Sequence, residues 1–296
     1  MPTPEAMIAV DWGTTNRRAY VIGRNGELID RFSDDQGVSA ITAGNFPSAI
    51  ADVRAKLGQR AMLLAGMIGS NRGWIEAPYA ACPAGLAELV AGVKRVSALD
   101  AVIVPGLHYS NKTRDDVMRG EEVQLLGAVV AGLAPQNAVA CHPGTHAKWA
   151  KLQDGAIMAF RTVMTGELFA LLKTHSILAE NLRKPVRVGD PFAAGVRRSL
   201  DHGELTADLF GIRASSVLGR LADDDAGSYA SGLLIGADIA AGLEFAGGSE
   251  IIYLIGDPNL TTLYSAALRE ASRDSIEIDG EAAFLAGIRA VARSIW

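Results

Sequence analysis

The sequence has little of what secreted or membrane-spanning proteins carry. It contains two cysteines, Cys82 and Cys141, which are far apart and lack metal-site spacing, so we expect small buried thiols in a reducing cytoplasm. No basic segment leads into an apolar one near the start, so we expect no secretory signal. The longest uncharged stretch, residues 123–147, is interrupted by prolines and amides, whereas a membrane span needs about 20 mainly apolar residues.

The sequence also lacks a surplus of positive charge. Its formal net charge is −5, whereas a nucleic-acid-binding surface normally shows a basic patch, so we expect no nucleic acid among its partners. The sequence is rich in hydrophobic residues, which make up 49% of its 296 residues. That length is large for one compact core and sufficient for two domains of ordinary size.

The chain opens with a pattern of strand, polar turn, strand, tight turn and strand. Strands are predicted at 7–10, 19–22 and 28–32, with Gly13-Thr14 in the first turn and Asn25-Gly26, a strong hairpin signal, in the second. The same order returns with strands at 138–141, 148–152 and 156–163, around Gly144-Thr145 and Asp154-Gly155. The Gly-Thr turns are 131 residues apart and the hairpin turns 129. This offset indicates an internal duplication, although two unrelated hairpins would look the same.

Predicted helices alternate with further short strands. The helices are expected at 46–57, 116–133, 166–173, 191–202, 228–244, 260–271 and 281–294, and the strands at 62–65, 101–104 and 251–255. Alternation of this kind predicts an α/β protein. The segment 134–137, Ala-Pro-Gln-Asn, is the best candidate for a boundary. We therefore expect domains at 1–135 and 136–280, each with a mixed sheet, with the last helix, within 281–296, packing back on the first.

The first motif that carries chemistry is Asp11-Trp12-Gly13-Thr14-Thr15-Asn16. A strand delivers the Asp11 carboxylate at its end, and Gly13 allows the backbone to turn closely around a ligand. The hydroxyls of Thr14 and Thr15, with exposed backbone N–H groups, can cradle phosphate oxygens. Asp11 can hold Mg²⁺ through water. A hairpin turn rich in turn-forming residues would have the same appearance.

The second half offers a partner motif, Pro143-Gly144-Thr145-His146-Ala147-Lys148. Its Gly144-Thr145 turn lies beside Lys148, and two such turns facing one another across a cleft would grip a polyphosphate from both sides. Between the two motifs, Arg119-Gly120-Glu121-Glu122 stands at a helix start. A phosphoryl-transfer enzyme needs a carboxylate to accept the proton of its substrate. The alternative is that adjacent acids in a first helical turn are surface residues favoured by the helix dipole.

Two further loops at strand ends offer binding groups. Residues 66–79 supply a hydroxyl, a guanidinium, a carboxylate and two aromatic rings, from Ser70, Arg72, Trp74, Glu76 and Tyr79. This mixture suits a polyhydroxy acid, although an ordinary ordered loop is the alternative. Gly256 follows an apolar strand and would let a flat adenine approach the backbone. A plain connection between a strand and a helix would look the same.

The order of these parts resembles that in the actin-like ATPase superfamily of sugar kinases. Within it, seven segments are similar to the 2-dehydro-3-deoxygalactonokinase family: DWGTTNRRAY, GMIGSNRGWIEAPY, MRGEEVQLLG, HPGTHAKW, TGELFALLKTHSIL, YASGLLIGADIA and IGDPNLTTLYSAAL. The resemblance runs from about Ile8 to the end of the chain. Two positions depart from it, because Ala147 stands where the family is expected to have serine, and Asp257 where a second glycine is common in the superfamily.

The resemblance implies two ribonuclease-H-like domains with a cleft between them. It implies a cytoplasmic kinase that uses ATP and Mg²⁺ to convert 2-dehydro-3-deoxy-D-galactonate to its 6-phosphate, in galactonate breakdown. The implied first phosphate motif is Asp11, Gly13, Thr14 and Thr15, the second is Gly144, Thr145 and Lys148, and the adenosine motif contains Gly256.

The resemblance also implies a catalytic acid at the helix start. This position falls on Glu121, with Glu122 as the competitor, where sugar kinases of the superfamily carry aspartate. The loop at 69–79 is expected to bind the sugar acid, with Asn16 and Arg17 nearby. A guanidinium can grip a carboxylate with two hydrogen bonds, so Arg72 or Arg17 is expected to pair with the substrate carboxylate.

Three alternatives to this function remain. The nearest is a kinase for another sugar or sugar acid, and the sequence does not separate the galactonate-derived from the gluconate-derived substrate, which differ at one hydroxyl. A regulator on this fold usually has a DNA-binding helix-turn-helix before the first phosphate motif. Only six residues precede Met7, too few for that motif, so we do not expect a regulator. An actin-like or chaperone-like ATPase would need extra subdomains. We expect a small-molecule partner and no membrane; a homodimer stays open.

Overall fold

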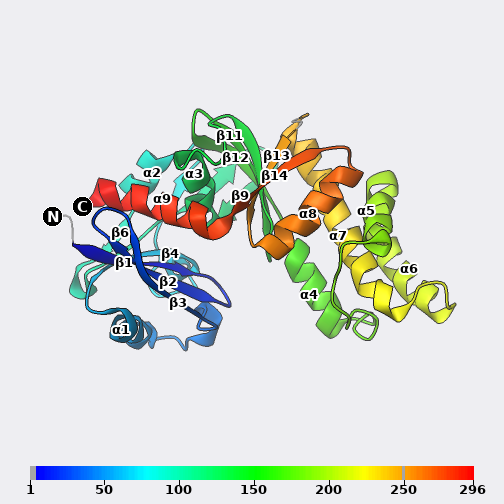
Figure 1. Ribbon diagram of the computed structural model, residues 1–296, viewed down its shortest axis with the longest axis horizontal. Coiled ribbons are helices and arrows are strands. Elements are labelled where there is room, and N and C mark those ends of the chain that lie inside the picture. The colour runs from blue at the N-terminus through cyan, green and yellow to red at the C-terminus, as the bar shows by residue number, and fades with distance from the viewer. Residues whose placement is uncertain (1–4, 249–250) are drawn as a thin grey trace. The chain divides into compact units, whose positions relative to one another are not determined.

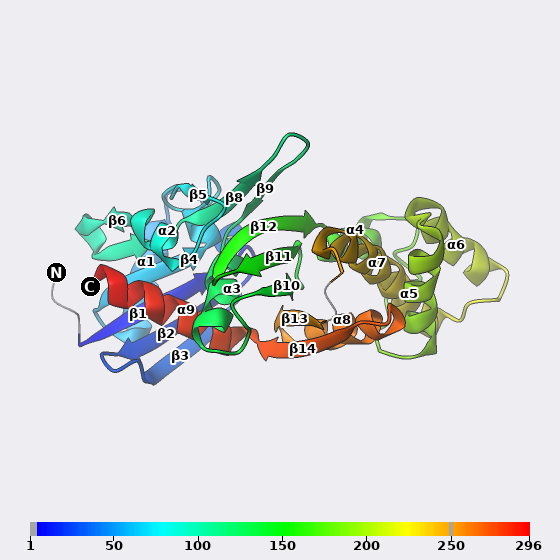
Figure 2. The ribbon, with the colours of Figure 1, turned by 90° about the horizontal axis from the view of Figure 1, so that it is seen from above.

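The computed structural model describes residues 5–248 and 251–296, so the first four residues of the predicted first domain lie outside it. The chain divides into two compact units. Unit 1 comprises Met1–Gln136, Gln153–Ala159 and Glu281–Trp296, and unit 2 comprises Asn137–Leu152 and Phe160–Gly280. Both units combine sheets and helices (Figures 1 and 2). The α/β fold class expected from the sequence is therefore confirmed, while the assignment of substrate to the first domain and nucleotide to the second stays a prediction.

A six-stranded sheet forms the centre of unit 1, in the order β3-β2-β1-β4-β7-β6. Its strands are β1 (Ala6–Trp12), β2 (Arg17–Gly23), β3 (Leu28–Asp34), β4 (Ala61–Gly66), β6 (Lys94–Val96) and β7 (Ala101–Ile103). β1 pairs antiparallel with β2 and parallel with β4. A separate three-stranded sheet contains β5 (Tyr79–Ala81), β8 (Gly106–Ser110) and β9 (Asp115–Met118).

Helices cover both faces of the six-stranded sheet, α1 (Phe46–Leu57) on one and α9 (Gly280–Ile295) on the other (Figure 1). Successive side chains of a strand point to opposite faces. Trp12 therefore faces α1, where its ring meets Phe46, while Tyr20 faces α9 and packs on Phe284. Unit 1 also contains α2 (Leu86–Ala91), α3 (Glu121–Val130) and the short 3-10 helices η1 (Val38–Ala40), η2 (Met67–Gly69) and η3 (Ser97–Leu99).

A five-stranded sheet has the order β12-β11-β10-β13-β14 and belongs to unit 2 except for residues 153–159 of the β11–β12 hairpin, which are part of unit 1. Its strands are β10 (Ala138–His142), β11 (Ala147–Gln153), β12 (Ala156–Val163), β13 (Ile251–Gly256) and β14 (Asp274–Asp279). β10 pairs antiparallel with β11 and parallel with β13, which repeats the arrangement of β1, β2 and β4. The predicted hairpin turn is also present, because Asp154 and Gly155 both have positive φ, 51° and 76°, as a type I′ turn requires.

Five helices of unit 2 are described: α4 (Thr165–His175), α5 (Asp190–His202), α6 (Leu205–Val217), α7 (Asp223–Ala246) and α8 (Pro258–Glu270). α5 and α7 lie side by side in both views (Figures 1 and 2). By length and composition alone, α7 could cross a membrane. Most of its apolar stretch is buried inside the protein, however, and Asp238 lies within it. α7 therefore packs as a core helix of unit 2.

One predicted helix is wrong in its first part. The helix expected at 116–133 is divided into strand β9, which ends at Met118, and helix α3, which begins at Glu121. The break falls at Gly120, whose φ of 113° is incompatible with a continuous helix. Sequence periodicity also missed several short or polar elements, namely α2, α6, β5, β6, β8, β9 and β14.

Candidate active site

Asp11 lies near the carboxyl end of the central strand β1 in unit 1. Its side chain is 17% exposed and lies 3.4 Å from the guanidinium of Arg18, on the neighbouring strand β2. Burial raises the pKa of Asp11 to about 6; Arg18 opposes this shift and the charge of Glu121 adds to it. The charge of Glu121, the other predicted catalytic carboxylate, therefore acts on Asp11.

The turn after Asp11 is held by backbone hydrogen bonds. Gly13 N donates to Asn16 O at 2.9 Å and closes the turn. The carbonyl oxygens of Gly13, Thr14 and Thr15 accept from the backbone N–H groups of residues 37–39. The side chains of Thr14, Thr15 and Asn16 are exposed. The turn thus has a fixed backbone, and its hydroxyl and amide groups face solvent, as a phosphate or sugar contact requires.

Two glycines bring the start of α3 beside the end of β1. Gly66, at the end of β4, has a φ of 92°, and a Cβ there would lie 2.7 Å from the carbonyl oxygen of Trp12. A Cβ on Gly120 would lie 3.2 Å from the Cα of Gly66. Side chains at these two positions would push the segments apart. The absence of side chains here allows Glu121 to lie near Asp11.

The two adjacent glutamates occupy different environments. Glu122 is fully buried, and its carboxylate accepts the Gly120 N–H at 2.9 and 2.7 Å. Burial, together with the charge of Glu121, raises the pKa of Glu122 to about 8, against the opposing effect of the hydrogen bonds. Glu121 is partly exposed and accepts from the Arg119 backbone N–H at 3.1 Å. Glu121 is therefore the one of the two whose carboxylate a substrate can reach.

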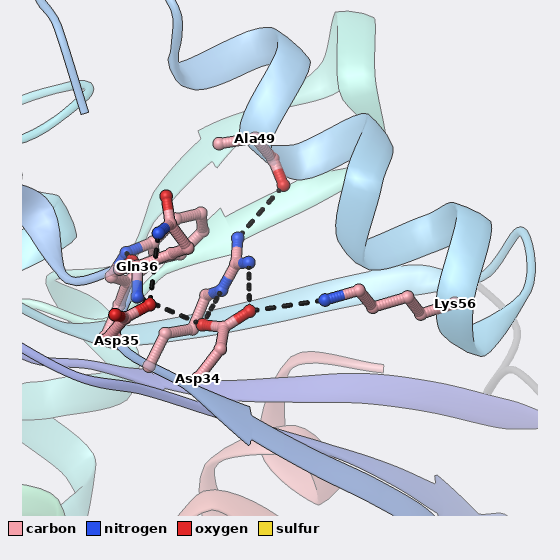
Figure 3. A network of polar contacts seen from close by, with 7 residues as sticks. Asp34, Asp35, Gln36, Ala49 and Lys56 are labelled. Atoms are coloured by element: carbon pink, nitrogen blue, oxygen red, sulfur yellow. Dashed lines mark hydrogen bonds and ion pairs between the residues drawn. The ribbon is translucent and has the colours of Figure 1, made fainter. Parts of the chain in front are cut away.

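The structure changes the expectation for Arg17. This side chain is buried and its guanidinium donates to both carboxylate oxygens of Asp34, at 3.1 and 2.7 Å, and to the carbonyl oxygen of Ala49. Figure 3 shows this network, with Lys56 also directed at Asp34. Because side chains alternate along β2, Arg17 faces α1 while Arg18 faces Asp11. Arg17 thus serves the packing of unit 1, and we no longer expect it to bind the substrate.

The predicted substrate loop, 69–79, is ordered by contacts with its own backbone. The buried Ser70 hydroxyl donates to Met67 O at 2.7 Å and accepts from Arg72 N at 3.2 Å. The side chains of Arg72 and Glu76 are exposed, and those of Trp74 and Tyr79 are half-buried. Ser70 therefore shapes the loop, while Arg72, Glu76 and the two rings remain able to contact a substrate.

Arg119 joins this loop to the start of α3. Its guanidinium donates to the carbonyl oxygen of Ala77 at 2.8 Å and lies 4.1 Å from the centre of the Tyr79 ring. Its backbone N–H binds Glu121. Sequence reasoning missed this residue and also Arg18, although the two-residue period of β2 was a signal that Arg18 shares a face with Asp11.

In unit 2, the Gly144-Thr145 turn packs against the first turn of α4. Thr145 O accepts the backbone N–H of Glu167 at 2.9 Å, and the Glu167 carboxylate contacts the ring of the neighbouring His146. The Lys148 ammonium is buried and donates to His146 O at 2.9 Å. Thr145 itself is exposed, so its hydroxyl is available to a ligand while Lys148 supplies positive charge from below the turn.

The predicted adenosine motif lies next to this turn. An added Cβ on Gly256 would lie 3.6 Å from Pro143 O and 3.9 Å from His142 Nε2. The Asp257 side chain caps α8 by accepting the Asn259 N–H at 2.8 Å. The structure therefore brings Gly256 and the second phosphate motif together within unit 2, and it explains Asp257 as a helix cap.

Comparison with known proteins identifies the family. A family model described as 2-keto-3-deoxy-galactonokinase matches residues 11–291. The chain is 36% identical to the 2-dehydro-3-deoxygalactonokinase of Escherichia coli (strain K12), over 97% of this chain and 98% of that protein. It belongs to the 2-keto-3-deoxy-galactonokinase family.

Solved structures agree with this membership. The kinase has a TM-score of 0.88 and 34% identity to the crystal structure of a provisionally named 2-dehydro-3-deoxygalactonokinase from Sinorhizobium meliloti, with 98% of this chain and 99% of that chain covered. It also has a TM-score of 0.53 and 12% identity to a dehydratase activator from Clostridium difficile, over 98% of this chain and 95% of that chain. This second likeness concerns the fold alone. The expected actin-like ATPase fold is thereby confirmed.

Proposed function

We propose that this kinase transfers the terminal phosphoryl group of ATP to the 6-hydroxyl of 2-dehydro-3-deoxy-D-galactonate, in galactonate breakdown. Membership of the family, over nearly the whole chain, supports this substrate. The observation that supports the chemistry is the packing of the start of α3 on the end of β1, through Gly120, Gly66 and Trp12, together with the effect of the Glu121 charge on Asp11.

Glu121 acts as the general base in this proposal. The primary hydroxyl of the substrate is a poor nucleophile while protonated, and a carboxylate within hydrogen-bond reach can orient it and take its proton. The substrate oxygen then bonds to the terminal phosphorus, the bond from that phosphorus to the bridging oxygen breaks, ADP leaves and the proton resides on Glu121. The Arg119 backbone N–H orients the Glu121 carboxylate for this task.

Asp11 fits a role as a holder of Mg²⁺. Its carboxylate is partly exposed at a strand end beside the Thr14-Thr15 turn, and oxygen ligands are those that Mg²⁺ prefers. Within residues 5–248 and 251–296, no three His, Cys, Asp or Glu side chains gather as a metal cluster. Mg²⁺ keeps several waters and is usually bound through one or two carboxylates and substrate phosphates, so Asp11 would hold the ion together with water and nucleotide oxygens. The bound ion would neutralise phosphate charge.

Nucleotide binding in unit 2 rests on Gly144, Thr145, Lys148 and Gly256. The turn at Gly144-Thr145 offers backbone N–H groups and a hydroxyl, Lys148 adds a positive charge, and Gly256 leaves room for a flat base nearby. In unit 1, Gly13, Thr14 and Thr15 would contact phosphate, while Asn16, Arg72, Trp74, Glu76 and Tyr79 would contact the sugar acid, with Ser70 shaping their loop. A cytoplasmic location and a homodimer also remain proposals.

The decisive experiment is a coupled ADP-release assay over a panel of 2-keto-3-deoxy acids and neutral sugars. We expect the highest kcat/KM for 2-dehydro-3-deoxy-D-galactonate, a lower value for its gluconate-derived epimer, and far lower values for neutral sugars. A preference for another sugar acid would support the alternative, a kinase of the same chemistry with a different substrate. Equal kcat/KM for the acid and a neutral sugar of the same length would contradict carboxylate recognition.

A further inference from the structure

A buried side-chain network in unit 2 lies behind the proposed nucleotide motifs. Asp238, on α7, is fully buried, and its carboxylate accepts three hydrogen bonds. Trp149 Nε1 donates to it at 2.7 Å and Thr165 Oγ1 at 2.5 Å, and the Tyr264 hydroxyl is the third donor. All three donors are neutral. An apolar side chain would avoid the cost of burying this carboxylate, so the network contributes fixed geometry more than net stability.

The three donors come from the three elements that carry the nucleotide motifs. Trp149 lies on β11, four residues after Thr145, and Tyr264 lies on α8, eight residues after Gly256. Thr165 is the first residue of α4, the helix that packs against the phosphate turn. One carboxylate on α7 therefore holds β11, α4 and α8 together.

The link from Thr165 to the phosphate turn is direct. The next residue, Gly166, approaches the turn so closely that a Cβ there would lie 2.5 Å from Gly144 O. The residue after it, Glu167, donates its backbone N–H to Thr145 O at 2.9 Å. A shift of Thr165 would therefore move the backbone that forms the turn.

We infer that Asp238 is a positioning residue for nucleotide binding: it fixes β11, α4 and α8 so that the Gly144-Thr145 turn and Gly256 keep their places around one ligand. The inference rests on the proposed nucleotide role of these motifs. Backbone N–H groups bind phosphate only when they point at its oxygens, and misplacement by about 1 Å can cost up to 10²-fold.

The test compares two variants of the network with a matched control. Thr165→Val keeps the shape of the side chain and removes one hydrogen bond, and Asp238→Asn keeps the volume and replaces one acceptor oxygen by an N–H donor. Ser199→Ala is the control, because the buried Ser199 hydroxyl donates to Leu233 O at 2.7 Å and joins α5 to the same helix α7. For each variant, KM for ATP, KM for the sugar acid, kcat and Tm are measured.

We expect Thr165→Val and Asp238→Asn to raise KM for ATP about tenfold with little change in KM for the sugar acid. Ser199→Ala should lower Tm without moving either KM. If Thr165→Val changes KM for ATP no more than Ser199→Ala does, the inference is overturned. Should Asp238→Asn fail to fold, Thr165→Val decides alone.

Gly256→Val separates this inference from the proposed function. If Gly256→Val raises KM for ATP and Thr165→Val does not, only the role of Asp238 is refuted. If Gly256→Val leaves KM for ATP unchanged, the proposed adenosine motif is refuted, and the inference that depends on it is refuted too.

Discussion

Replacing Glu121 by glutamine tests the proposed base most directly. Glutamine has the same shape and can still accept the Arg119 backbone N–H, which Glu121 accepts at 3.1 Å, so the start of α3 should keep its geometry. The ability to take a proton is lost, together with the negative charge that raises the pKa values of Asp11 and Glu122. We expect kcat to fall by about 10²-fold, which corresponds to about 2.7 kcal/mol of transition-state stabilisation, while KM for ATP hardly changes.

Glu122→Gln is the matched control in the same ADP-release assay. Because burial raises the pKa of Glu122 to about 8, its carboxyl group is mostly neutral at pH 7, and a neutral amide can accept the Gly120 N–H in its place. We expect kcat to change by less than about threefold, because the substitution removes no charged hydrogen bond. Glu121→Asp, which keeps a carboxylate, should retain more activity than Glu121→Gln.

The outcomes of this comparison are distinct. A large loss in Glu122→Gln with near-normal kcat in Glu121→Gln would mean that the substrate reaches the buried carboxylate, contrary to the reasoning from exposure. Normal kcat in both variants would place the base elsewhere in the chain.

Three further predictions concern metal, pH and substrate. Asp11→Asn should lower kcat by about 10²-fold at saturating Mg²⁺, because metal and fixed dipoles stabilise transition-state charge; undiminished turnover would contradict its role. Glu122 has a folded-state pKa of about 8 against an ordinary 4.5, so its contribution to stability is complete below pH 4.5 and is lost as pH rises toward 8. The free energy of unfolding, measured in urea at pH 5 and pH 8, should therefore fall between these pH values by roughly 4 kcal/mol more in the parent chain than in Glu122→Gln. An equal pH dependence in both proteins would refute this. Arg72→Met should raise KM for the sugar acid by about 10- to 100-fold, the value of a charged hydrogen bond, whereas Arg114→Met, another exposed arginine of unit 1, should not.

The sequence by itself determined the features that depend on neighbouring residues. Asn25-Gly26 and Asp154-Gly155 marked two hairpin turns, in which Gly26, Asp154 and Gly155 have positive φ. The apolar runs before Asp11 and Gly144 identified β1 and β10, and their repeated order predicted two related sheets. These signals depend only on neighbouring residues, so they can be recognised without knowledge of the rest of the fold.

Only the tertiary structure decided which of two neighbouring residues faces the candidate site. Arg17 and Arg18 are the same residue type in adjacent positions. The pairing of β2 with β1 and the packing of α1 direct Arg17 to an ion pair with Asp34 and Arg18 to an ion pair with Asp11. Glu121 and Glu122 are likewise adjacent, yet in the folded protein Glu121 is partly exposed and Glu122 is buried.

The same holds for contacts between residues far apart in the chain. Asp238 lies in a run of small and apolar residues whose composition gives no sign of Trp149, Thr165 and Tyr264 as its partners. A buried carboxylate takes its environment from whichever elements fold around it, and that environment is fixed by packing rather than by sequence neighbours.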